Sequence, residues 1–212
     1  MRGLFISFEG TEGSGKTSVI KSCEEFLKNK GFKVILTREP GGIKISEQIR
    51  NIILSNDNTE MDPMTEALLF AASRRQHLVE KIIPALNDGY IVLCDRYVDS
   101  SLVYQGISRG IGLEKVLEIN RYAIDDLFPD LTIFIDVRPE VGLKRVFNGE
   151  GREINRLDLE KLPFHQKIYD GYVSLCDMFS ERIKRVNGEQ DRELVSRDSI
   201  ELIKELLRRN NE

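Results

Sequence analysis

Short apolar runs alternate with amphipathic segments along the whole chain. Apolar runs predict strands near residues 3–8, 33–37, 90–94 and 131–135, with a weaker one at 183–187. Between these runs, apolar residues recur at spacings of three and four, which predicts helices. Strands that alternate with helices favour an α/β fold in which helices cover both faces of a parallel sheet.

The helical spacing can be followed through most of the chain. It predicts helices around residues 19–27, 45–53, 63–86, 116–123, 139–147, 157–181 and 202–207, and a helix start near residue 99. Pro63 suits the first turn of the long helix at 63–86. No internal repeat, low-complexity tract or linker is present. We therefore expect a single domain over residues 1–212.

Composition and charge narrow the class of protein. Apolar residues make up 41% of the chain, charged residues 31%, and the net charge is −4. This balance is ordinary for a globular protein and gives no reason to expect nucleic acid or an anionic membrane as partner. No apolar stretch approaches the ~20 residues of a membrane span, and the N-terminus lacks a signal-peptide pattern. We expect a cytoplasmic protein.

Cysteine and histidine usage gives little support to a metal or disulfide framework. Cys23, Cys94 and Cys176 are far apart and have apolar neighbours, so buried reduced thiols are expected. His77 and His165 have no cysteine or histidine partner nearby in the sequence, which argues against zinc.

Residues 10–17 read GTEGSGKT, the phosphate-loop pattern of glycine, four residues and Gly-Lys-Thr. Glycines allow successive N–H groups to turn towards an anion, and the following helix adds its positive end. In such a loop Lys16 bridges the β- and γ-phosphates and the Thr17 hydroxyl is a ligand of Mg²⁺. The alternative is a glycine-rich turn that binds nothing. The strand before the loop and the helix after it favour the phosphate loop.

Charged residues follow two other predicted strands. Arg38 and Glu39 end one strand and lead into Pro40, Gly41 and Gly42. Ligands bind at such carboxyl ends in open α/β sheets.

Asp95 ends the next strand, where a carboxylate can hold Mg²⁺ or its water; the alternative is that it merely caps the next segment. From Asp99 to Arg109, hydrogen-bonding side chains are unusually dense, which suits the recognition of a polar ligand.

Two further segments leave alternatives open from the residues alone. Phe70, Arg74 and His77 lie near one face of the predicted helix 63–86. An aromatic residue at such spacing favours the core over a ligand platform. Residues 148–157 are polar, with two glycines and the arginines Arg152 and Arg156, which is typical of a lid over phosphates and also of a plain surface loop.

Four stretches occur in a fixed order: GTEGSGKT at 10–17, TREPGG at 37–42, DRY at 95–97 and SSLVYQG at 100–106. In this combination the chain resembles thymidylate kinase throughout its length. The resemblance implies an enzyme that transfers the γ-phosphoryl group of ATP to dTMP, with Mg²⁺, in dTTP biosynthesis. It also implies a three-layer phosphate-loop NTPase fold, with a five-stranded parallel sheet flanked by helices, and a homodimer.

For the donor side, the resemblance implies roles at the matching positions of this chain. The ATP phosphates are expected on Gly10, Thr11, Glu12, Gly13, Ser14, Gly15, Lys16 and Thr17, and adenine on Arg145. Thr17 and Asp95 are the expected metal residues. Glu12 faces the sugar hydroxyl of the acceptor and the metal region. Lys16, Arg38, Arg96 and Glu12 are expected to serve catalysis, together with a lid arginine.

For the acceptor side, the resemblance implies that Arg38 and Arg96 grip the phosphate of dTMP, with Glu39 and Arg50 nearby. Phe70 stacks on the thymine ring, which reverses the preference for the core. The remaining expected contacts are Arg74 with O4, Ser101 and Gln105 with the other polar edge of the base, and Tyr104 with the sugar C2′.

Some members of the family carry an arginine in the phosphate loop, where this chain has Gly13. The missing charge is then expected from Arg152 or Arg156, because an arginine on the transferring phosphoryl group can contribute about 10³–10⁵ in rate. Rival hypotheses are a kinase of another monophosphate or of a nucleoside, and a GTP-dependent switch. The chain lacks the Asn-Lys-x-Asp stretch by which such switches select guanine.

Overall fold

The computed structural model describes residues 2–148, 156–157 and 159–210. Within these ranges five strands form one parallel sheet in the order β2-β3-β1-β4-β5. The strands are β1 (Phe5–Glu9), β2 (Val34–Arg38), β3 (Ile91–Asp95), β4 (Leu131–Asp136) and β5 (Ile183–Asn187). They coincide closely with the predicted apolar runs. The prediction of a parallel α/β sheet is therefore confirmed.

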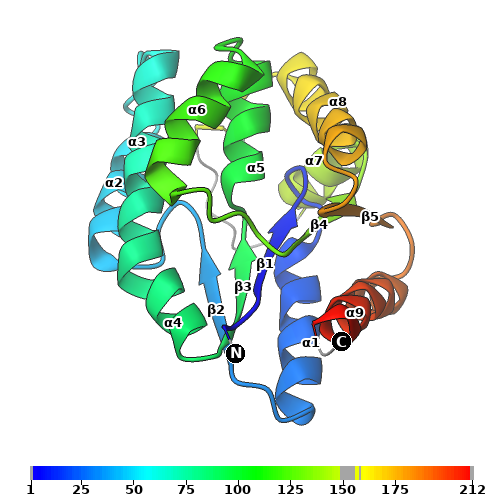
Figure 1. Ribbon diagram of the computed structural model, residues 1–212. Helices are drawn as coiled ribbons and strands as arrows, with labels where there is room; N and C mark the ends of the chain where they lie inside the picture. The colour runs from blue at the N-terminus through cyan, green and yellow to red at the C-terminus, as the bar shows by residue number, and fades with distance from the viewer. Residues whose placement is uncertain (1, 149–155, 158, 211–212) are drawn as a thin grey trace.

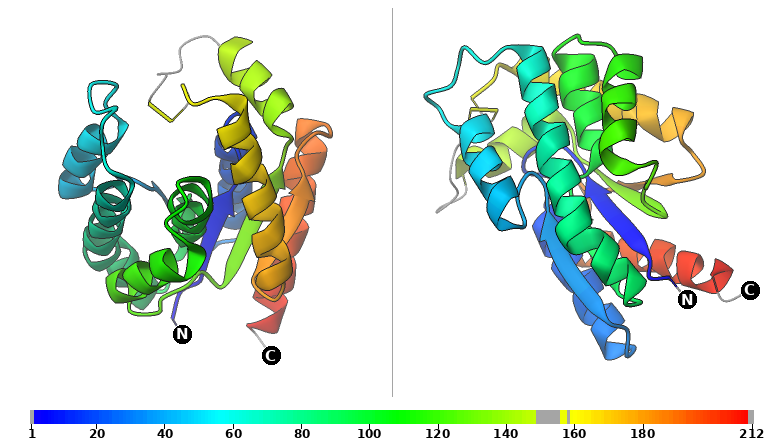
Figure 2. Two further views of the ribbon diagram at one scale, coloured as in Figure 1. Left: turned by 90° about the horizontal axis from the view of Figure 1, so that it is seen from above. Right: turned by 60° about the vertical axis from the view of Figure 1, so that its left-hand side comes forward.

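Helices cover both faces of the sheet (Figures 1 and 2). On one face α1 (Lys16–Asn29) packs beside α9 (Arg192–Arg209). The helices grouped on the other face are α3 (Pro63–His77), α4 (Ile83–Asn87), α5 (Val98–Ser101), α6 (Leu113–Ile124) and α8 (Leu162–Met178), with the π-helical segments η1 (Leu78–Ile82) and η2 (Leu102–Ser108). Finally, α2 (Lys44–Leu54) packs on α3, and α7 (Pro139–Asn148) lies beside α8.

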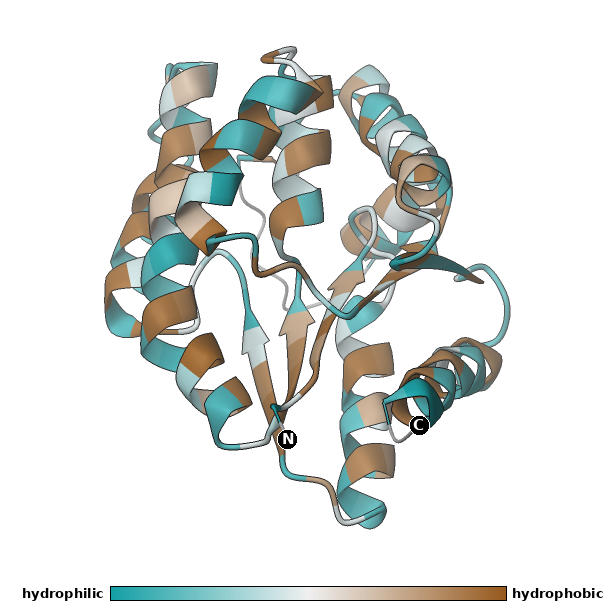
Figure 3. Ribbon diagram, in the orientation of Figure 1, coloured by the Kyte–Doolittle hydropathy of each residue, from teal (hydrophilic) through white to brown (hydrophobic). Residues whose placement is uncertain are grey.

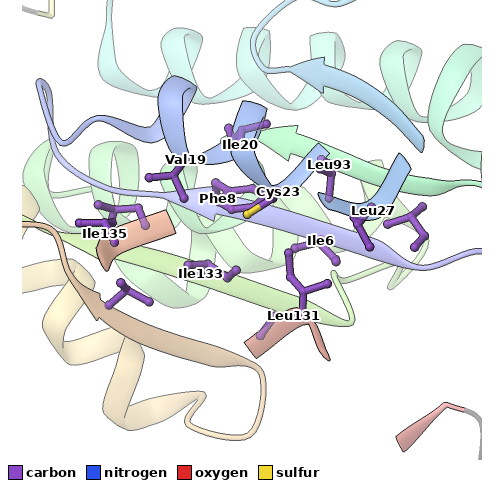
Figure 4. Packing of buried hydrophobic residues seen from close by; sticks show 14 of the residues in the cluster. Ile6, Phe8, Val19, Ile20, Cys23, Leu27, Leu93, Leu131, Ile133 and Ile135 are labelled. Atoms are coloured by element: carbon purple, nitrogen blue, oxygen red, sulfur yellow. The ribbon is translucent and has the colours of Figure 1, made fainter. Parts of the chain in front are cut away.

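The central strand β1 shows why both faces are apolar. Successive side chains of a strand point to opposite faces, so Ile6 and Phe8 join the cluster under α1, whereas Phe5 joins the cluster on the other side. Figure 4 shows Ile6 and Phe8 packed with Cys23 of α1. Figure 3 shows the hydrophobic colour concentrated along the sheet and on the helix faces towards it. Each fully buried side chain of this size contributes about 1.5–3 kcal/mol relative to exposure.

Parallel pairing brings the carboxyl ends of the strands to one edge of the sheet. Arg38 of β2 pairs with Asp95 of β3, and Asp95 pairs with Phe8 of β1. The loops that follow these three strands therefore start side by side. They carry the phosphate-loop pattern, the TREPGG stretch and the DRY stretch.

Two predicted helix starts are wrong. The helix expected around residues 202–207 already begins at Arg192. The helix expected from residue 157 begins at Leu162 and ends at Met178. Lys161 is extended and Pro163, which has no N–H to donate, occupies the first turn, so a helix start fits here. Arg156 and Leu157 are buried in the turn before it.

The prediction of buried reduced thiols is confirmed for Cys23 and Cys94, whereas Cys176 is reduced but only partly buried. Cys23, Cys94 and Cys176 are free, and the first two are fully buried. Burial raises the pKa of the Cys23 thiol to about 12, which makes it a poor nucleophile. Over the described ranges, none of the helices is both long enough and apolar enough to span a bilayer.

Candidate active site

The loop after β1 has the backbone that an anion cradle needs. Gly13 and Gly15 adopt left-handed φ values of 70° and 88°, which are costly for a residue with a Cβ. Gly15 is the N-cap of α1, and its neighbour Lys16 starts the helix. The Thr11 hydroxyl fastens the loop to the Val137 carbonyl at 3.0 Å. The loop thus places the positive end of α1 beside backbone N–H groups.

Close packing excludes a side chain at position 13. A Cβ built on Gly13 meets the carbonyl oxygen of Gly142 in α7, and a Cβ on Gly142 meets the carbonyl oxygen of Glu12. Loop and helix therefore touch through their backbones. An arginine at position 13 would require α7 to move, which gives a structural reason for the glycine here.

Lys16 is buried in the loop that it follows. Its Nζ donates to the carbonyls of Gly10 and Thr11 at 3.1 and 3.3 Å and to Ser14 Oγ at 3.3 Å. Burial lowers the pKa of Lys16 to about 8, and the charge of Arg96 acts in the same direction. Binding of an anion to this ammonium opposes both effects, so a polyphosphate is a fitting partner.

Thr17 and Asp95 meet at the base of the loop. The Thr17 hydroxyl donates to Asp95 Oδ2 at 3.5 Å, and both groups are solvent-accessible. Asp95 does not cap the following helix, because α5 starts at Val98 with Tyr97 as its N-cap and no side-chain cap bond. The capping alternative is therefore wrong. A hydroxyl and one carboxylate are hard oxygen donors of the kind that Mg²⁺ prefers.

Arg96 lines the cleft and is held there by four side chains, those of Glu12, Tyr104, Ser100 and Tyr172. It has a left-handed φ of 69°. Its Nη2 donates to Glu12 Oε1 at 2.7 Å, and its guanidinium lies 5.1 Å from the centre of the Tyr104 ring. The Tyr104 hydroxyl donates to the same Glu12 oxygen at 2.9 Å. Glu12, Arg96 and Tyr104 are thereby joined into one unit next to Lys16.

Glu9 supports this unit from beneath, and it was not predicted from the sequence. It ends β1, is fully buried, and accepts from the Tyr97 backbone N–H at 2.7 Å. Its other oxygen accepts from the hydroxyls of Ser100 and Tyr172 at 2.6 and 2.8 Å. These two hydroxyls also accept from Arg96 Nη1, at 3.3 and 3.2 Å. The only signal in the sequence is an acidic residue ending an apolar strand.

The titration of Glu9 predicts a measurable pH dependence of stability. Burial, with the nearby charge of Asp99, raises the pKa of Glu9 from 4.5 to about 7. Between these values the folded protein retains a proton that the unfolded chain has released, so this contribution to stability is present below the window and is lost as pH rises through it. Its size is on the order of a few kcal/mol.

Glu9→Gln carries no such titration. The melting temperature of the variant minus that of the wild type should therefore become more positive from pH 5 to pH 8, as measured by circular dichroism. A difference that stayed constant over this range would contradict the raised pKa of Glu9.

Two further cationic side chains, those of Arg38 and Arg50, line the cleft near the end of β2. Arg38 is half-exposed and pairs with Glu47, with nitrogen and oxygen 3.0 Å apart. Arg38 and Arg50 both donate to the Pro40 carbonyl, at 3.2 and 3.0 Å. Because Arg38 is solvent-accessible and its pair is exposed, it can turn towards an incoming anion at small cost.

Arg74 and Glu39 form a buried pair that fixes the inner wall. Arg74 Nε donates to Glu39 Oε2 at 2.7 Å, and both side chains are almost completely buried. The other carboxylate oxygen of Glu39 lies 3.0 Å from His77 Nδ1, and Thr37 bonds the far side of that ring. Arg74 also donates to Ser101, to Asn120 and to the Tyr97 carbonyl. Glu39 therefore orients Arg74 rather than projecting freely into the cleft.

Phe70 lies in the apolar core and at the same time lines the cleft. It is 9% exposed and belongs to the apolar cluster that includes Leu102 and Tyr104. It also lines the cleft, one helical turn before Arg74. Its assignment to the core is confirmed, and the stacking role remains a prediction.

One cleft of about 590 Å³ joins these groups. The predicted residues that line it are Glu12, Gly13, Ser14, Gly15, Lys16, Thr17, Arg38, Glu39, Arg50, Phe70, Arg74, Asp95, Arg96, Ser101, Tyr104, Gln105 and Arg145. The phosphate loop and the side chains of Phe70, Arg74 and Gln105 all line it. A cradle for phosphates and a half-apolar, half-polar pocket thus share one space.

The family model for thymidylate kinase matches residues 8–199. The chain belongs to the thymidylate kinase family. It is 53% identical over 207 residues to the thymidylate kinase of Bacillus thuringiensis strain Al Hakam, covering 98% of this chain and all of that relative. It is 55% identical over 189 residues to that of Clostridium novyi strain NT, covering 89% of this chain and 92% of the relative.

A solved structure agrees with these relatives. The crystal structure of thymidylate kinase from Ehrlichia chaffeensis superposes with a TM-score of 0.77 at 30% sequence identity. The match covers 96% of this chain and 99% of the other. The fold is the phosphate-loop NTPase fold that the sequence predicts. As a member of the thymidylate kinase family, the protein is a phosphotransferase that phosphorylates dTMP in nucleotide biosynthesis.

Three further arginines were assigned through the thymidylate kinase resemblance. Arg145 lines the cleft beside the phosphate loop and donates to the Gly188 carbonyl at 3.3 Å. Arg152 and most of the predicted lid lie outside the described residues. Arg156 is buried, donates to the Ile53 carbonyl, and pairs with Glu66 at 2.6 Å, away from the cleft lining.

Proposed function

We propose that the protein transfers the γ-phosphoryl group of ATP directly to the phosphate of dTMP, giving dTDP and ADP. One observation carries this proposal: the phosphate loop and the side chains of Phe70, Arg74 and Gln105 line one and the same cleft. A triphosphate on Lys16 and a monophosphate nucleotide opposite it would point their phosphates at each other. In-line transfer requires that arrangement.

The hydrogen-bonding groups of the pocket complement thymine. Arg74 donates four of its five N–H groups to protein acceptors. The fifth, the second N–H of Nη2, has no acceptor among the described residues. The carbonyl oxygen of Gln105 likewise accepts no bond within the described ranges. A donor suits O4 of the base and an acceptor suits its N3–H. Phe70 offers its ring for stacking, worth about 1–3 kcal/mol per base.

Arg38 and Arg96 suit an acceptor that already carries a phosphate. Both line the cleft, and Lys16 lies on the phosphate-loop side of it. The attacking phosphate oxygen is anionic at neutral pH, so the reaction needs no general base. The residues then act by holding two polyanions at bonding distance and neutralising their charge. A nucleoside kinase would instead need a carboxylate aimed at a 5′-hydroxyl.

We further propose that Thr17 and Asp95 bind Mg²⁺ together with the nucleotide phosphates. Their oxygens lie 3.5 Å apart at the foot of the loop. In the part of the chain that the structure describes, no group of three or more metal-binding side chains occurs. Mg²⁺ is usually held by only one or two carboxylates besides phosphates and water, so the small donor set fits it. The ion would neutralise charge on the transferring group.

The remaining assignments rest on the family resemblance. We propose one domain over residues 1–212 with a lid at 148–157, in which Arg152 or Arg156 reaches the phosphoryl group and Arg145 supports adenine. We also propose a cytoplasmic homodimer. Exposed Leu68 on α3 and Tyr122 on the adjacent α6, 52% and 80% accessible, support an interface on these helices. Sedimentation analysis would separate monomer from dimer.

A coupled ADP-release assay tests the proposed function. With ATP and Mg²⁺, we expect turnover with dTMP, less with dUMP, and little with dCMP, dGMP or thymidine. Faster turnover with thymidine would favour a nucleoside kinase. Slow hydrolysis of nucleotide that dTMP does not stimulate would favour a switch protein and would overturn the proposal.

A further inference from the structure

Glu66 on α3 is a buried carboxylate that the proposed mechanism does not use. It is 1% exposed and lies one helical turn before Phe70. Its Oε1 accepts from Gln105 Nε2 at 2.9 Å, and Arg109 Nε approaches the same oxygen at 3.4 Å. Its Oε2 accepts from Arg156 at 2.6 Å. The guanidiniums of Arg109 and Arg156 thus compensate the buried carboxylate of Glu66. Its Oε1 also bonds Gln105, the side chain proposed to recognise the nucleobase.

We propose that Glu66 is a positioning residue that fixes the orientation of the Gln105 amide and thereby sets the choice of pyrimidine. A carboxylate between guanidiniums can only accept hydrogen bonds, so Gln105 must turn its nitrogen towards Glu66. The carbonyl oxygen of Gln105 then points away from Glu66 and is left as an acceptor in the cleft. The inference rests on the proposed function, because it assigns this acceptor to a nucleobase.

The chemistry of the bases explains the selection. Thymine and uracil present an N3–H donor, which the Gln105 carbonyl satisfies, whereas cytosine presents an unprotonated N3 acceptor. To donate to cytosine, Gln105 would have to rotate its amide, and its carbonyl oxygen would then face the Glu66 carboxylate. Two buried acceptors facing each other are unfavourable, so the pocket disfavours cytosine without any direct contact from Glu66.

Glu66→Gln tests this role with little change in shape. Glutamine at position 66 can donate or accept, so Gln105 becomes free to present either end. The ratio of kcat/KM for dTMP to kcat/KM for dCMP should fall about tenfold or more. Both substrates carry the same phosphate, so a general effect of the lost charge on anion binding cancels in the ratio.

Two further variants separate positioning from stability. Glu160 also pairs with Arg109, at 2.6 Å, but makes no bond to Gln105, so Glu160→Gln should leave the ratio unchanged. In the double variant E66Q/Q105E, glutamine at position 66 donates to the carboxylate at 105. The carboxylate at position 105 can only accept hydrogen bonds from the base, and the net charge of the protein is the same as in the wild type. The ratio of kcat/KM for dTMP to that for dCMP should therefore return towards the wild-type value.

The result that would refute the role of Glu66 differs from the result that would refute the proposed function. A wild-type enzyme that does not phosphorylate dTMP refutes the proposed function itself. An active, folded Glu66→Gln enzyme whose ratio stays within twofold of the wild type refutes the role of Glu66. If this variant does not fold, ¹⁵N NMR of the wild type decides. A Gln105 side-chain N–H shifted downfield by a carboxylate, and retained with dTMP bound, supports the proposal; its absence overturns it.

Discussion

Lys16→Ala is expected to lower kcat for dTMP phosphorylation by about 10³-fold or more, because a single preorganised charge on a reacting phosphate is worth several kcal/mol. The Lys16 ammonium is buried inside the phosphate loop against Gly10, Thr11 and Ser14. Its lowered pKa of about 8 shows that the protein alone compensates this charge poorly. Nucleotide phosphates supply the missing counter-charge, so the interaction strengthens as charge develops in transfer.

The fold should not depend on Lys16. Its bonds are to uncharged groups of its own loop, so its removal should change the melting temperature little or raise it slightly. Lys30→Ala, at the exposed C-terminal end of the same helix, is the matched control and should keep normal turnover. Steady-state kinetics and thermal unfolding of both variants give the comparison. Near-normal turnover of Lys16→Ala would contradict the assigned mechanism.

Arg96→Ala is expected to lower kcat/KM for dTMP by about 10²–10³-fold, with a much smaller change in KM for ATP. Arg96 is fixed by Glu12, Tyr104, Ser100 and Tyr172 at the edge of the cleft. This guanidinium is already ordered when a phosphate arrives, so binding costs little further conformational entropy. Its loss also removes the positive charge that lies 2.7 Å from the Glu12 carboxylate, next to the substrate phosphates.

Arg96→Lys separates charge from geometry. Lysine keeps the positive charge but cannot reproduce the planar fork that bonds Glu12 on one arm and hydroxyls on the other. We expect intermediate activity, below the wild type and above Arg96→Ala. Arg121→Ala, at an exposed pair on α6, should have no effect on kcat/KM. A kcat/KM for dTMP within threefold of the wild type in Arg96→Ala would contradict the role assigned to Arg96.

Local patterns predicted the fold and much of the cleft. The spacing of the glycines, with a strand before them and a helix after them, predicted the phosphate loop that contains Lys16. The predicted ends of the strands placed Arg38 and Asp95 at one edge of the sheet. These inferences succeed because a parallel sheet gathers its carboxyl strand ends, whatever the distance in sequence. The start of α8 was misjudged because apolar spacing continues through Leu157, whereas the helix begins only at Leu162, after the extended Lys161.

The supporting network could not be predicted from the sequence. Glu9 bonds Tyr172, which is 163 positions away, and Glu66 bonds Arg156, which is 90 positions away. Asn120 accepts from Arg74 across 46 positions, with no motif to mark it. Such partners depend on how helices pack across the sheet. Periodicity could at most indicate that Glu9 and Glu66 are acidic residues on faces otherwise directed towards the core.

A crystal structure of the protein with dTMP tests the central claim most directly. The thymine ring should lie against Phe70 at about 4 Å, with N3 towards Gln105. The phosphate should lie between Arg38 and Arg96 and face the loop that carries Lys16. A pyrimidine bound away from Phe70, or a phosphate out of reach of both arginines, would contradict the account.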